Sequence, residues 1–210
     1  MLIAKTLSLY KKRDVQEALV EQAQHKEVSI NFSNKYFSKR PDALFADGDI
    51  LEFAKKKGTS FHCSEELWDN QLHINTGMDK KAIAEIRIGW DLILDIDCPY
   101  WNLSKLITHL FVKALEEHGI TSVTVKFSGN KGFHIAVPFE AFPEVYGGKQ
   151  TKDLFPEAPR KIALYLLKFL TEPNNKLVLV KDNYIIFEGK KKINIDTLAE
   201  KLNKTRDELL

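Results

Sequence analysis

Apolar and polar residues alternate most clearly over residues 90–97, and this period of two predicts a strand. Its apolar face comprises Trp90, Leu92, Leu94 and Ile96, and its other face comprises Asp91, Ile93, Asp95 and Asp97. Pro99 ends the strand. A spacing near 3.6 then runs over residues 103–115 and predicts a helix, with Asn102 as its N-cap and Gly119 as its stop.

Alternation returns over residues 123–127 and again over 133–137, before Pro138. Between the two runs stand Gly129, Asn130, Lys131 and Gly132, a composition typical of a tight turn. The two strands are therefore expected to pair antiparallel. Together with the preceding strand and helix they form a strand–helix–strand–hairpin unit.

The rest of the chain gives weaker signals. Asp14 with Glu17, and Asp49 with Glu52, match capping boxes that open two helices, the second stopped by Gly58. We expect loop with short strands over 31–47, a long loop over 140–159, a helix over 159–171 and strands over 177–180 and 184–187.

The last stretch, 196–210, reads as a helix from Asp196 to Asn203, followed by a capping box at Thr205 and Glu208. That box introduces only five more residues, too few for a stable helix. We therefore expect a truncated or split protein. The overall prediction is an α+β fold with a core over 1–175 and a strand pair and helical segment over 176–210.

Composition places the chain among globular proteins. Apolar residues make up 44% and charged residues 29%, and the formal net charge is +2, so any nucleic-acid site must be a local patch. The two cysteines, Cys63 and Cys98, have no metal-binding spacing, so neither a disulfide framework nor a zinc site is expected. No signal peptide or membrane span is recognisable, which favours a cytoplasmic protein.

Asp95 and Asp97 form the first candidate site. Residues two apart on a strand project their side chains to the same face, about 7 Å apart at ~3.3 Å per residue. Two carboxylates held this close suit a hard divalent cation, and Mg²⁺ typically takes one or two carboxylates together with substrate phosphates. The alternative is a pair of solvated aspartates at the end of a strand.

The hairpin supplies the second candidate site. Ser128 shares a strand face with Lys126, and we expect Ser128, Lys131 and His134 to converge across the turn. A hydroxyl, an ammonium and an imidazole are all phosphate-binding groups, and the glycines let a ligand approach the backbone. Taken alone, a structural hairpin with a half-exposed histidine is the commoner interpretation. Next to a carboxylate pair, the set indicates metal-dependent nucleotidyl transfer.

These two motifs, Leu92-Ile93-Leu94-Asp95-Ile96-Asp97 and Phe127-Ser128-Gly129-Asn130-Lys131-Gly132-Phe133-His134, resemble those of the archaeo-eukaryotic primase superfamily. The chain is most similar to the small, catalytic subunit of archaeal DNA primases. Further similarity extends over 26–42 and 59–64, and the whole resemblance covers roughly residues 10 to 170. It implies the primase catalytic fold, two-metal primer synthesis from nucleoside triphosphates on single-stranded DNA, Mg²⁺ or Mn²⁺ as cofactor, and a primase large subunit as partner in the primosome.

The resemblance also assigns roles. Asp95 and Asp97 match the metal-binding aspartates, and Ser128, Lys131 and His134 match residues that hold the phosphates of the incoming nucleotide. Lys131 replaces the more usual arginine, so a point charge replaces a bidentate donor. Arg40 matches a nucleotide-contacting arginine loosely.

Two departures from the family pattern affect the function. The third metal carboxylate has no clear match; Asp182 is a weak candidate, and Asp196 is better explained as a helix N-cap. Without this carboxylate the 210-residue chain is expected to make few or no primers by itself. The cysteine-rich zinc knob of many relatives is also missing, so no zinc is expected.

Two further functions remain open. The chain could bind nucleotide or template without polymerising, or residues 194–210 could form a helix-turn-helix of a DNA-binding regulator. Trp101, beside Pro99 and Tyr100, could stack on a base, although packing in the core is the favoured interpretation.

Overall fold

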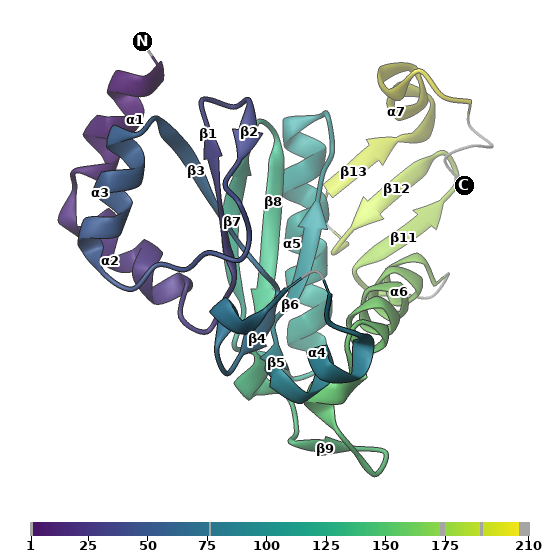
Figure 1. Ribbon diagram of the computed structural model, residues 1–210. Coiled ribbons are helices and arrows are strands. Elements are labelled where there is room, and N and C mark those ends of the chain that lie inside the picture. The colour runs from purple at the N-terminus through teal and green to yellow at the C-terminus, as the bar shows by residue number, and fades with distance from the viewer. Residues whose placement is uncertain (1, 76, 173–174, 190, 206–210) are drawn as a thin grey trace. The chain divides into compact units, whose positions relative to one another are not determined.

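The structure is a computed structural model that describes residues 2–75, 77–172, 175–189 and 191–205. It is a mixed α+β chain in which several small antiparallel sheets are joined to helices (Figure 1). The chain divides into two compact units, one formed by Met1–Asp91 with Phe142–Phe155 and the other by Leu92–Ala141 with Pro156–Leu210. Within the described ranges, no helix is long and apolar enough to cross a membrane.

The first unit combines three N-terminal helices with short strands. Its elements are α1 (Leu2–Tyr10), α2 (Arg13–Gln22), β1 (Val28–Phe32), β2 (Tyr36–Phe37), α3 (Asp47–Lys55), β3 (Gly58–Cys63), β4 (Glu66–Trp68), η1 (Gln71–His73), α4 (Lys80–Ile86), β5 (Arg87–Trp90), β9 (Val145–Tyr146), β10 (Lys149–Gln150) and η3 (Thr151–Leu154). The sheet β2-β1-β3 is antiparallel throughout. Its core holds buried apolar side chains from β1, α3 and the helix ends, among them Tyr10, Val28, Ile30, Ile50 and Ala54.

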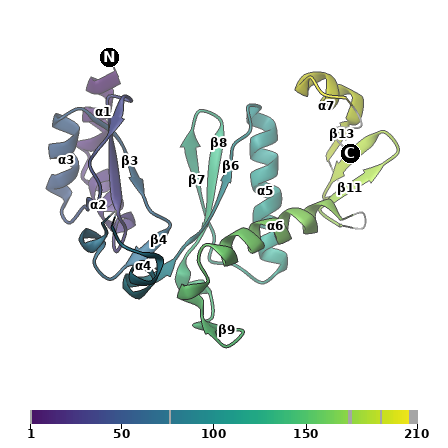
Figure 2. The same ribbon diagram turned by 45° about the vertical axis from the view of Figure 1, so that its right-hand side comes forward.

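The second unit contains the predicted strand–helix–strand–hairpin arrangement. Its elements are β6 (Leu92–Ile96), α5 (Trp101–Glu117), β7 (Thr124–Gly129), β8 (Gly132–Val137), η2 (Phe139–Ala141), α6 (Glu157–Thr171), β11 (Val178–Lys181), β12 (Tyr184–Phe187), β13 (Lys191–Asn194) and α7 (Ile195–Leu202). The strands form two antiparallel sheets, β6-β8-β7 and β11-β12-β13. Figure 2 shows α5 running alongside the first of these sheets.

Alternation explains why β6 and β8 lie at the core. Leu92, Leu94 and Ile96 are buried, and on the neighbouring strand so are Ile135 and Val137. Because Leu94 stands directly opposite Ile135, both strands turn one continuous apolar face inward. The strand–helix–strand–hairpin unit is confirmed, and Gly119 follows the helix as expected, with a positive φ of 77°. Two details differ: Trp90 belongs to β5 and pairs with β4 rather than continuing β6, and Asn102 is not the N-cap of α5, because the helix begins at Trp101 with Tyr100 in the N-cap position.

Some helix starts differ from the prediction. Asp49 is not the N-cap of α3, a position that Ala46 takes; it lies in the first turn and caps from there, because its carboxylate accepts hydrogen bonds from the backbone N–H groups of Phe45 and Ala46. Gly58 does not stop that helix either, but begins β3, where an added Cβ would lie 2.8 Å from the carbonyl oxygen of Phe53. The glycine is needed for this close approach rather than for a cap. Asp14 lies in the first turn of α2, which starts at Arg13.

The C-terminal helix also begins differently. Asn194 is the N-cap of α7, with its side-chain oxygen accepting from the N–H of Thr197, so the expectation that Asp196 takes this place is wrong. Asp196 lies in the first turn instead and bonds to Asn183. The second helix expected near the C-terminus falls on residues 206–210, outside the described residues.

Candidate functional site

A row of three polar side chains crosses the β6-β8-β7 sheet. Asp95 on β6 stands opposite His134 on β8, and His134 stands opposite Lys126 on β7. Directly opposed residues project to the same face of an antiparallel sheet, so the three lie side by side. His134 Nε2 is 3.5 Å from Asp95 Oδ1. The row lies on the face opposite the buried leucines of β6.

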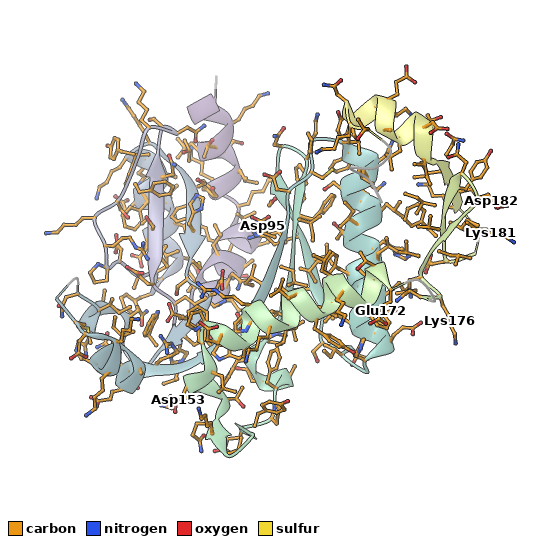
Figure 3. The ribbon with its side chains drawn as sticks, turned by 90° about the vertical axis from the view of Figure 1, so that its right-hand side faces the viewer. Asp95, Asp153, Glu172, Lys176, Lys181 and Asp182 are labelled. Atoms are coloured by element: carbon orange, nitrogen blue, oxygen red, sulfur yellow. The ribbon has the colours of Figure 1, made fainter. Side chains whose placement is uncertain are left out.

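These side chains can reach a ligand. The side chain of Asp95 is 65% exposed and that of His134 is 34% exposed, although both belong to strands whose alternate residues are buried. Figure 3 shows Asp95 among the side chains of this sheet. The core face of the strands therefore fixes the backbone, while the other face presents a carboxylate, an imidazole and an ammonium.

Ser128 joins this face at the hairpin turn. Gly129 pairs with Gly132, Asn130 has a φ of 50°, and the strand register shifts at Ser128. A Cβ added to Gly132 would lie only 2.6 Å from Ser128 Oγ. Since residues 132 and 134 project to the same face, the Ser128 hydroxyl lies on the His134 side of the sheet, in space that only glycine leaves open.

Two other predicted residues occupy the edges of this site. Asp97 comes one residue after the end of β6 and is exposed, and Lys131 is exposed within the turn. Asp97 continues the alternation that carries Asp95. The structure thus places Asp95, His134 and Ser128 on one face of the sheet. Lys126 lies on this face as well, and the sequence indicates its position because Lys126 and Ser128 share a face of the same predicted strand.

Arg40 belongs to the first unit and has a partner there. Its guanidinium binds the carboxylate of Glu27 through two nitrogens, with Nε 2.9 Å from Oε1, and Glu27 is buried. The hydrogen bond to Glu27, together with the charge of that carboxylate, raises the pKa of Arg40. Arg40 also lines an open pocket of about 420 Å³ with Ser29, Phe37 and His62. The loose match to a nucleotide-contacting arginine thus falls on a residue that already holds a buried acid.

The described residues contain no group of three or more histidines, cysteines, aspartates or glutamates placed to hold a metal ion. Asp95 and Asp97 are suitable oxygen donors for Mg²⁺ or Mn²⁺, with substrate phosphates needed to complete the shell. Asp182 lies in the turn between β11 and β12, with a φ of 56°, and Asp196 lies in α7. Neither is on a strand paired with β6, and Figure 3 shows Asp182 well away from Asp95.

Comparison with known proteins identifies no relative that would assign a role to these residues. No family model matches the chain, and no curated protein matches its sequence.

Proposed function

We propose that the chain is a nucleotidyltransferase of the archaeo-eukaryotic primase type, which acts as a catalytic small subunit that makes primers on single-stranded DNA. The observation that carries this proposal is the row of Asp95, His134 and Lys126 across three neighbouring strands, with Ser128 beside it. A carboxylate next to phosphate-binding donors is what metal-dependent transfer of a nucleotide requires. The similarity of the two motifs to primases supports the same reaction.

Each side chain has a part in this proposal. Asp95 and Asp97 would hold Mg²⁺ or Mn²⁺, and the bound metal supplies positive charge to the reacting phosphate and to the leaving pyrophosphate. Ser128 and His134 donate hydrogen bonds to the triphosphate, and Lys131 and Lys126 offset its negative charge. Asp95 Oδ1 lies 3.5 Å from His134 Nε2, so the carboxylate would hold this side of the imidazole and leave Nδ1 for the bound phosphates.

The edge position of β6 is relevant to activity. In the described sheet β6 is the edge strand and pairs only with β8. Asp95 and Asp97 alone would hold two metal ions poorly, and a carboxylate on a strand added at this edge would complete the coordination. Such a strand, from this protein or from the large subunit, would increase primer synthesis.

The test is primer formation on a single-stranded template with labelled nucleoside triphosphates and Mn²⁺. We expect a low yield from this chain that is abolished by chelation and by Asp95→Asn/Asp97→Asn. Asp153→Asn, which removes the charge of an exposed carboxylate in the first unit, is the matched control and should leave the yield unchanged. Product that persists in the double variant would contradict the proposal. Triphosphate binding without any product, even when the large subunit is added, would favour a non-catalytic, nucleotide-binding relative.

A further inference from the structure

Three aromatic rings meet at the hairpin end of the second unit. The Trp101 ring centroid lies 5.5 Å from that of Phe127 and 5.3 Å from that of Phe133, and the two phenylalanines are 5.7 Å apart. Trp101 is the first residue of α5, and Phe127 and Phe133 face each other across β7 and β8. Figure 2 shows the start of α5 close to this hairpin. We call these three residues the aromatic cluster.

The aromatic cluster is only partly buried. Phe133 is half-buried, but Trp101 is 44% exposed and Phe127 is 52% exposed, and the neighbouring Tyr100 is 40% exposed. Further along the same sheet face, Ile135 and Val137 are buried. The apolar face of the sheet therefore extends beyond its buried part, and the aromatic rings at its end are exposed to solvent. Contiguous exposed apolar surface of this kind marks a binding site more often than an isolated exposed side chain does.

The chemistry around the rings favours an anionic ligand with flat groups. The ammonium of Lys105, one turn along α5, lies 5.9 Å from the Trp101 ring centroid. Asp97 is the acidic residue nearest to Trp101 in the chain, and the alternation that it continues assigns it to the other face of the sheet, with Asp95. Bases of single-stranded nucleic acid stack on aromatic faces, and lysines pair with the phosphates between them.

We propose that the aromatic cluster and Lys105 form a stacking platform for single-stranded nucleic acid. The inference rests on the proposed function, because it names a surface that would hold single-stranded template beyond the base that pairs with the incoming nucleotide. The platform is distinct from the nucleotide site. Phe133 pairs with Ile96, whereas the next residue, His134, pairs with Asp95, so the two sets of side chains lie on opposite faces of one sheet.

The experiment measures binding of a labelled ten-nucleotide thymidine oligomer by fluorescence anisotropy, without metal or triphosphate. An abasic oligomer of equal length and charge serves as the second probe. We expect the thymidine oligomer to bind the wild-type protein at least about fivefold more tightly than the abasic one, because stacking needs bases. Trp68 and Trp90 are buried, so quenching of the intrinsic tryptophan emission by thymidine would report on Trp101.

Leucine variants remove the rings but keep apolar bulk, which protects folding. Trp101→Leu and Phe127→Leu should each weaken binding of the thymidine oligomer about fivefold or more. Tyr184→Leu, at an exposed tyrosine on β12, is the control and should not change it. Lys105→Gln should reduce the slope of log affinity against log salt by about 0.7, which corresponds to one phosphate contact.

Two results would overturn the inference. One is equal affinity of the wild-type protein for the thymidine and abasic oligomers, or no binding of either. The other is thymidine binding by Trp101→Leu and Phe127→Leu as tight as by Tyr184→Leu, which would assign the cluster to a protein partner or to packing alone. Asp95→Asn should bind the oligomer normally, so loss of triphosphate binding in that variant tests the proposed function separately.

Discussion

Gly132 shows how one residue controls the geometry of the candidate site. It is buried on β8, and the place of its missing side chain is taken by the hydroxyl of Ser128. An added Cβ would also lie 3.2 Å from the carbonyl oxygen of Ile96. The glycine is therefore needed for close packing between the turn and β6, and it keeps the Ser128 hydroxyl next to the imidazole-bearing face.

Gly132→Ala is expected to destabilise the protein by about 1–3 kcal/mol, the usual cost of overpacking. It should also weaken triphosphate binding, because Ser128 Oγ must move. Chemical denaturation and nucleotide titration measure the two effects. Ser128→Ala/Gly132→Ala should regain part of the stability but not the binding. Gly48→Ala is the control, since nothing lies within 4 Å of its added Cβ. Equal stability of the Gly132→Ala and Gly48→Ala proteins would contradict this packing.

Elements with strong periodicity could be predicted from the sequence. The alternation of β6 and β8 and the apolar stripe of α5 indicate buried faces directly, and the glycine turn indicates their hairpin. The pairing of Asp95 with His134 could not be predicted from the sequence. It depends on the strand order, in which β8 lies between β6 and β7, and only the structure shows this order.

Short elements without caps could not be predicted. Helix α1 has no acidic residue in its first turn, and β3 lacks alternation because both faces of Gly58–Cys63 are partly covered. The expected long loop over 140–159 contains short strands and 3₁₀ turns, which backbone bonds such as Thr151 N–H to Glu144 O hold in place. The sequence predicts Asp196 as the N-cap of α7, but Asn194, two residues earlier, makes the capping hydrogen bond.

A buried ion pair joins two segments of the first unit. The Lys26 ammonium, just before β1, lies 2.5 Å from Asp91 Oδ2, just after β5. The two side chains are 7% and 14% exposed. Because both charges have left water, each depends on the other, and loss of one partner should cost far more than at a surface pair.

Lys26→Met should lower the free energy of unfolding by about 3–5 kcal/mol, because it leaves the Asp91 charge without its lysine. Lys26→Met/Asp91→Asn should regain a large part of this loss. Denaturation followed by circular dichroism provides the comparison, with Lys35→Met as the exposed control. Similar stability of Lys26→Met and Lys35→Met would show that the pair has little effect.

At the scale of the whole molecule, the chain consists of two compact units, and the carboxylate–imidazole–ammonium row belongs to the second. The second unit presents different chemistry on the two faces of one small sheet. One face presents Asp95, His134 and Ser128, and the other ends in the aromatic cluster. We propose a nucleotide as the ligand of the first face and a nucleic-acid single strand as the ligand of the second.

The most direct test of this account is calorimetric titration of the protein with a nucleoside triphosphate in the presence of Mn²⁺. We expect binding that weakens roughly tenfold or more in His134→Ala, since a hydrogen bond to a charged group contributes about 1.5–3 kcal/mol. Asp95→Asn should weaken it as well, while Asp153→Asn should not. Normal triphosphate binding by His134→Ala, with the protein folded, would contradict the account and leave the hairpin a purely structural feature.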